Sequence, residues 1–206
     1  VTLEGKTVYA AGVIGAASLT VASDAKLVVG GNVADILAQT AVDGERFGLK
    51  VTGDAAIAGE VSFGGKDLTA PLRVVIGGNL TLSDAAVLAV YATRASDIDF
   101  ATLYAEATPV TVAGKLTLND TSKIVPDSDY LTGASVRFTA GSVEIAAGAK
   151  FDAVGRGWGW TTKTGEFSHE IRGSRYTSDA ISAAHPETYA PGSGGRLPNE
   201  VTGAGY

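Results

Sequence analysis

The sequence predicts an all-β protein: a right-handed parallel β-helix (β-solenoid) with short helical insertions and a C-terminal excursion rich in glycine and aromatic residues. Three observations lead to this fold. They are a degenerate repeat of short strands, two alternating repeat lengths, and a composition in which Ala, Gly, Thr and Val make up half of the 206 residues. Small residues suit tight corners, and β-branched residues suit strands.

The repeat unit is an apolar residue, a Gly or Ala turn, a small polar or charged residue, and then an apolar-x-apolar strand. Its clearest copies are Ile76–Leu82 and Val112–Leu118, and looser copies are Ile14–Val21, Val51–Ile57 and Phe138–Ile145. The period-2 pattern places the apolar side chains on one face of each strand, and Thr, Lys or Glu on the other. In most copies a second strand follows, at Lys26–Val29, Ala86–Val90, Lys123–Val125 and Lys150–Val154.

The first apolar anchors of the five strands are residues 19, 55, 80, 116 and 143, so the spacings are 36, 25, 36 and 27. The longer intervals contain segments with near-helical spacing, which predict short helical insertions at about 31–48 and 92–108. Asn32 is a candidate helix cap, and Pro109 follows the second segment. Irregular loops are the alternative for both segments.

Strands this short cannot enclose a core alone, but they bury their apolar faces when coils stack at about 4.8 Å per coil. Val, Leu, Ile and Phe then point inward, and Thr or Asn can form ladders between coils. An immunoglobulin-like sandwich is the competing all-β fold. It favours hairpin signals such as Asp-Gly, and Asp43-Gly44 beside a predicted helix is the single example.

Composition changes after the coils of residues 1–154. Residues 155–206 hold both Trp, both His, ten of the 27 Gly, and five basic and five acidic residues. We predict a long ordered excursion packed on the coils, because disordered Gly/Ser segments usually lack aromatic residues. Disorder is the alternative.

The units Gly78-Asn-Leu-Thr-Leu82 and Gly114-Lys-Leu-Thr-Leu118 resemble the repeats of parallel β-helical regions in large bacterial surface and autotransporter-like adhesin proteins. The run that begins Gly155-Arg-Gly-Trp-Gly-Trp160 is similar to a glycine-rich insertion that follows a coil in some of them. The resemblance implies a structural role at the cell surface or outside the cell.

Catalytic, cofactor and metal sites are not predicted. The absence of Cys removes disulfides, thiolate nucleophiles and zinc knuckles, and two His residues cannot form a multi-histidine site. Ser168-His169-Glu170 are sequence neighbours, whereas catalytic triads assemble from distant positions, and we expect His185 to be a surface residue. The pairs Asp97/Asp99 and Asp127/Asp129 leave calcium binding open.

The net charge of −6 argues against nucleic acid as a partner, and charged residues interrupt every apolar run, so membrane insertion is not expected. The chain opens in strand pattern at Val1–Leu3 and closes at Val201–Tyr206 in what looks like the approach to another coil. We therefore expect end-to-end self-association, or covalent continuation with further coils.

These observations predict a structural, non-enzymatic segment of an extracellular or cell-surface fibre, filament or adhesin. The alternative is a carbohydrate-binding or carbohydrate-active β-helix protein, with glycans as partners. Trp158, Trp160 and Tyr176 are then the candidate residues for stacking on sugar rings.

Overall fold

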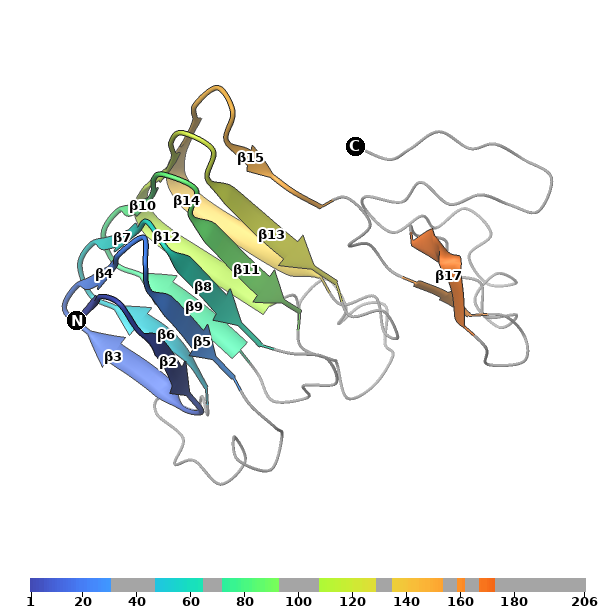
Figure 1. The fold of residues 1–206 in the computed structure, drawn as a ribbon, viewed down its shortest axis with the longest axis horizontal. Helices are drawn as coiled ribbons and strands as arrows, with labels where there is room; N and C mark the ends of the chain where they lie inside the picture. The colour runs from blue at the N-terminus through green and yellow to red at the C-terminus, as the bar shows by residue number, and fades with distance from the viewer. Residues whose placement is uncertain are drawn as a thin grey trace.

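The structure is a computed structural model. It describes residues 1–30, 47–64, 72–92, 108–128 and 135–153, and the backbone alone at 47, 72, 159–161 and 167–172. Every regular element in these residues is a β-strand, and most strands lie side by side in two curled parallel sheets (Figure 1). The predicted all-β class is therefore confirmed for this part of the chain.

The strands of the coils fall into three sets, which we call faces. Face 1 contains β3 (Val13–Ala16), β6 (Phe47–Val51), β9 (Leu72–Ile76) and the first halves of β12 (Thr108–Leu118) and β14 (Val136–Ile145). Face 2 contains β1 (Thr2–Leu3), β4 (Leu19–Val21), β7 (Ala55–Ile57), β10 (Leu80–Leu82) and the second halves of β12 and β14. Face 3 contains β2 (Thr7–Ala10), β5 (Lys26–Val29), β8 (Glu60–Phe63), β11 (Val87–Tyr91), β13 (Lys123–Asp127) and β15 (Lys150–Phe151).

The chain visits the faces in a fixed order, so a strand pairs with the strand one circuit later. On face 2 the register joins Leu19 to Ala55, Ala55 to Leu80, Leu80 to Leu116, and Leu116 to Val143. These are the five anchors that the repeat predicts, so the repeat and its spacings from Leu19 onward are confirmed. The first coil is shorter than the sequence pattern predicts, because Thr2 pairs with Thr20. All of these ladders are parallel, which contradicts the antiparallel sandwich for the described coils.

The predicted helical insertions at 31–48 and 92–108 lie almost entirely outside the described residues. At their ends, Phe47 and Gly48 belong to β6, and Thr108 begins β12. Both insertions leave the coils at the same place, between a strand of face 3 and the next strand of face 1.

Residues 155–206 are described in two short pieces. β16 (Gly159–Thr161) and β17 (Phe167–Arg172) pair in antiparallel orientation as a separate sheet. The predicted packing of the excursion on the coils lies outside the described residues.

The core is a column of apolar side chains that runs through the middle of the stack. On β10, for example, Leu80 and Leu82 are buried and Thr81 between them is half-buried, as the alternating pattern predicts. Leu82 stacks on Ile57 and Leu118 in the neighbouring coils. Burying each such leucine contributes about 1.5–3 kcal/mol, and the repeat multiplies this contribution along the stack.

The corner between faces 1 and 2 combines glycine with an Asn/Asp ladder. A Cβ on Gly114 would lie 2.9 Å from the carbonyl oxygen of Gly78, so only glycine lets the coils approach this closely. Asp54 Oδ1 accepts the backbone N–H of Asn79 at 2.7 Å, and Asn79 Oδ1 accepts that of Lys115 at 2.9 Å. Asp54 and Asn79 thus join successive coils through backbone N–H groups, and not by stacking one Asn side chain on another as the sequence pattern predicts.

The corner between faces 2 and 3 uses aspartate in the same way. Gly5 N–H donates to Asp24 Oδ1 at 3.0 Å, and Asp84 N–H donates to Asp120 Oδ2 at 3.0 Å. Asp84 and Asp120 both have φ of 55°, which aspartate tolerates better than most residues. These carboxylates hold one coil to the next.

We expect Leu82→Asp to lower the free energy of unfolding by more than about 3 kcal/mol, because it places an unpaired carboxylate in the core. Thr81→Asp, one residue away on the outward side, should cost under about 1 kcal/mol. Urea denaturation measures both values, and equal effects would contradict the inward position of Leu82.

At Ser122 we expect a substitution to raise the free energy of unfolding. Ser122 is fully buried and directly precedes Lys123 of β13, as Ala25 precedes β5 and Ala86 precedes β11, so the three residues belong to one column of the stack. The Ser122 Oγ has no hydrogen-bond partner among the described residues. Ser122→Ala should therefore raise the free energy of unfolding by about 1 kcal/mol. The same change at exposed Ser142 is the control and should leave stability nearly unchanged, and a loss of stability at Ser122 would show that its hydroxyl is bonded.

Candidate functional site: the open coil formed by β14 and β15

Several carboxylates of the coils make contacts between neighbouring coils. Asp24, Asp54 and Asp120 accept backbone N–H groups of another coil, as described above. Glu60 pairs with Lys26 at 2.6 Å, where the carboxylate hydrogen bond raises the pKa of that lysine. In the described part of the chain, no group of three or more His, Cys, Asp or Glu residues is placed to hold a metal ion.

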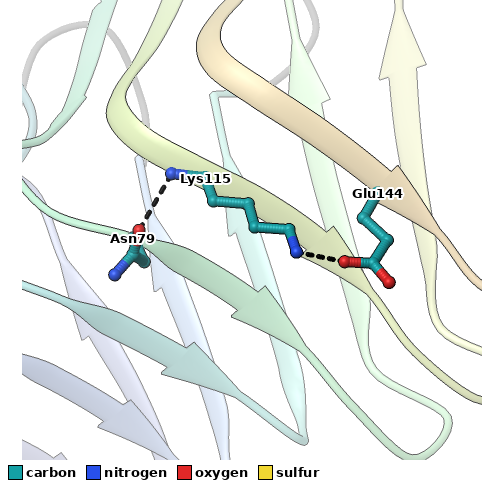
Figure 2. A network of polar contacts seen from close by, with 3 residues as sticks. All are labelled: Asn79, Lys115 and Glu144. Atoms are coloured by element: carbon teal, nitrogen blue, oxygen red, sulfur yellow. Dashed lines mark hydrogen bonds and ion pairs between the residues drawn. The ribbon is translucent and has the colours of Figure 1, made fainter.

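Figure 2 shows a chain of polar contacts that runs from Asn79, directly before β10, to Lys115 on β12 and Glu144 on β14. Asn79 accepts the backbone N–H of Lys115, and the Lys115 ammonium forms an ion pair with Glu144. The hydrogen bond that the Lys115 ammonium donates to Glu144, together with the charge of that lysine, holds the pKa of Glu144 below its usual range. Both side chains are about half exposed, so solvent and salt screen the pair.

The last described coil presents apolar side chains that lack cover. Val143, Ile145 and Phe151 occupy the same inward positions as Leu116, Leu118 and Ile124, which are buried in the coil before. They are nevertheless 54%, 47% and 37% exposed. The end of the described stack is therefore an apolar surface, which we call the open coil and define by β14 and β15.

An aromatic pair joins two faces of the open coil. The rings of Phe138 and Phe151 meet edge to face, with centroids 5.4 Å apart and an interplanar angle of 83°. Phe138 lies on face 1 and Phe151 on face 3, so the contact crosses the interior. Such a pair contributes about 0.5–1.5 kcal/mol beyond the area it buries, and it holds the open coil in shape.

The backbone of the open coil is also available for pairing. Within the described residues β14 pairs with β12 alone, and β15 pairs with β13 alone. One edge of each strand therefore presents N–H and C=O groups that can template a further strand. An apolar surface bounded by a strand edge can bind another coil.

The aromatic residues predicted to stack on sugars are not brought together by any described contact. Trp158 and Tyr176 lie outside the described residues, and Trp160 is described only as backbone in β16. Ser168, His169 and Glu170 are consecutive in β17, again as backbone alone, and His185 lies outside the described residues.

Of the four aspartates in the two predicted calcium-binding pairs, Asp127 alone lies in the described part of the chain. Asp97, Asp99 and Asp129 lie outside the described residues, and Asp127 ends β13, half-buried and with a polar interaction of its own. These pairs therefore remain predictions.

Sequence reasoning took Val143 and Ile145 as ordinary inward residues of the fifth copy. One signal in the sequence could have identified the open coil: no sixth copy of the full repeat directly follows the fifth. The sequence pattern also identifies neither β2 nor β8, because their four residues each are too few to show a clear period.

Comparisons of the chain with protein-family models, curated proteins and solved structures gave no match. Among the described residues no helix is long and apolar enough to cross a membrane.

The lowered pKa of Glu144 gives a pH prediction. The Lys115 contact should stabilise the protein at pH values above the pKa of an unfolded-state glutamate, and this stabilisation should disappear as the pH falls through the lower folded-state pKa. In an NMR titration Lys115→Met should move the Glu144 pKa upward, while Lys123→Met on face 3 should not. An unchanged Glu144 pKa in Lys115→Met would show that the ion pair does not form in solution.

Proposed function

We propose that this chain is a structural, non-enzymatic segment of an extracellular surface fibre, filament or adhesin, built as a right-handed parallel β-helix. The observation that carries the proposal is the use of the polar side chains. Asp24, Asp54, Asn79 and Asp120 tie coil to coil, where an enzyme would need acids and bases that converge on a substrate.

The usual twist of strands supports right-handed coils. A connection that leaves a strand and returns to a parallel neighbour in the same sheet is right-handed in about 98% of cases, because the strand twist favours that path. Every coil here makes such a return, for example from β4 through β5 and β6 to β7.

A coil stack is suited to a spacer because its length grows in proportion to the number of coils, by about 4.8 Å for each one. The apolar column continues through the described coils, and corner hydrogen bonds recur between several of them, so the same contacts could hold a further coil. The cysteine-free, Thr- and Gly-rich composition, and the resemblance of its repeat units to surface adhesins, support a place outside the cell.

The experiment combines localisation with glycan binding. Antibodies against the chain should label the surface of source cells, or filaments outside them, in immunogold microscopy, and labelling confined to the cell interior would contradict the proposal. On a glycan array the full chain should show no saturable binding.

A matched pair of variants identifies binding through the predicted aromatic residues. If glycans bind, and Trp158→Ala/Trp160→Ala abolishes binding while Tyr9→Ala at the exposed Tyr9 does not, the carbohydrate-binding alternative replaces the structural role. Binding lost equally in both variants would indicate nonspecific adhesion to exposed aromatic rings.

A further inference from the structure

We propose that the open coil binds the open coil of a second copy of this chain, so that two chains meet tail to tail across a two-fold axis through face 2. The second half of β14 then pairs with its own copy, and the first half of β14 pairs with β15 of the other chain. This inference rests on the coil architecture in the proposed function and adds the partner of its uncovered end.

The first support is the shape of the open coil. The stack rises by one strand spacing per circuit, so the first half of β14 on face 1 is its lowest strand and β15 on face 3 is its highest. A two-fold axis through face 2 sets the highest strand of each copy over the lowest strand of the other. Each face then has room for one antiparallel pair, and no gap remains.

A head-to-tail contact with the first coil of a second copy fits less well. Among the described strands, face 1 contains five, whereas face 2 and face 3 contain six each, because the series begins on face 2 with β1 and ends on face 3 with β15. Placing β1 of a second copy on β14, and its β2 on β15, would leave its β3 two strand spacings above β14. Face 1 would then lack one strand at the contact.

The second support is the match of apolar side chains. Phe138 and Phe151 lie seven residues before and six residues after Ile145, so each stands opposite the other residue of the second copy when Ile145 lies on the axis. Both occupy inward positions, because they pair with the buried residues Val110 and Ile124. Each copy already holds its own two rings 5.4 Å apart, so four rings would meet at the centre of the contact. Aromatic residues are enriched at such centres.

The third support is charge complementarity in the same register. Arg137 precedes Phe138, and Asp152 follows Phe151, so these two residues stand opposite each other on the outward side of the antiparallel pair. Arg137 is exposed, and Asp152 forms an ion pair with Lys150 at 3.2 Å in its own strand, which the arginine would join. Opposite charges directly across a strand pair are favourable, and the two-fold axis supplies this pair twice.

On face 2 the register sets Ile145 opposite its own copy and Val143 next to it. Glu144 then stands opposite Ala146 of the second copy, so the two Glu144 carboxylates do not oppose each other directly. The three exposed apolar side chains of the open coil are all covered. Three short strands form a smaller contact than the roughly 800 Å² per partner of a standard complex, so we expect a weak dimer.

Charge reversal tests this pairing in the full-length chain. Arg137→Asp and Asp152→Arg each set like charges across the contact, so either variant alone should raise the dissociation constant of the dimer by about tenfold or more. An equimolar mixture of the two variants should restore the dimer, because every arginine of one chain then faces an aspartate of the other. Sedimentation equilibrium up to millimolar concentration measures the constants. Lys123→Asp on face 3, one coil below, is the control and should leave the constant unchanged.

Three results would overturn the proposal. The first is a parent chain that stays monomeric up to millimolar concentration. The second is a series of species that grows beyond the dimer, which would favour head-to-tail stacking. The third is a mixture of folded variants that dimerises no better than either variant alone, which would exclude the two-fold register.

The chain contains no cysteine, so a single engineered cysteine gives a second test. Ile145→Cys lies on the predicted axis, about 5 Å from its own copy, and mild oxidation should therefore give a covalent dimer. Tyr9→Cys in the first coil is the control. Tyr9 is 76% exposed, more than Ile145, yet its variant should give about tenfold less dimer because no contact holds two copies of it together. Equal yields would indicate random collision and contradict the two-fold contact.

The outcomes separate this inference from the proposed function. A monomeric chain that antibodies still detect at the cell surface removes the dimer and leaves the structural role in place. Saturable glycan binding by a chain that dimerises as described removes the structural role and leaves the tail-to-tail contact in place.

Discussion

Parallel backbone pairing between successive coils is the constraint on which the rest of this structure depends. A one-residue slip in any ladder would turn its inward side chains outward, so each strand must meet the next in fixed register. Leu80, Leu116 and Val143 keep that register although the chain between them differs in length. The core, the corner ladders and the surface ion pairs all follow from this alignment.

The corners explain how register survives insertions. Asn79 joins coils at the corner between faces 1 and 2, and Asp120 at the corner between faces 2 and 3, and both do so through backbone N–H groups. Such bonds fix the coil spacing but leave the remaining corner free to vary. Loop closure entropy grows slowly with length, so insertions of different sizes there disturb the stack little. Insertions of different length can thus occur at one corner, while hydrogen bonds at the other two corners keep successive coils in register.

The sequence was sufficient for the strand repeat because its pattern is local. Alternation in Leu80–Leu82 reveals which side chains point inward, and the Gly or Ala turn within each copy marks the corner. It was insufficient for the division into three faces, because short strands such as β8 have too few residues to show a period. It also could not show which apolar residues lie at the end of the stack, since exposure of Val143 depends on what covers it and not on its neighbours in sequence.

The open coil links the stability of the stack to the proposed role in a fibre. A stack gains free energy from each interface between coils, so its end is always less stable than its middle. Val143 and Ile145 show this in their exposure, and Phe138 and Phe151 partly offset it by packing across the interior. An uncovered apolar end bounded by a strand edge also invites aggregation. A further coil laid on this end would bury Val143 and Ile145 and remove that hazard, so the same contact would add both length and stability to the stack.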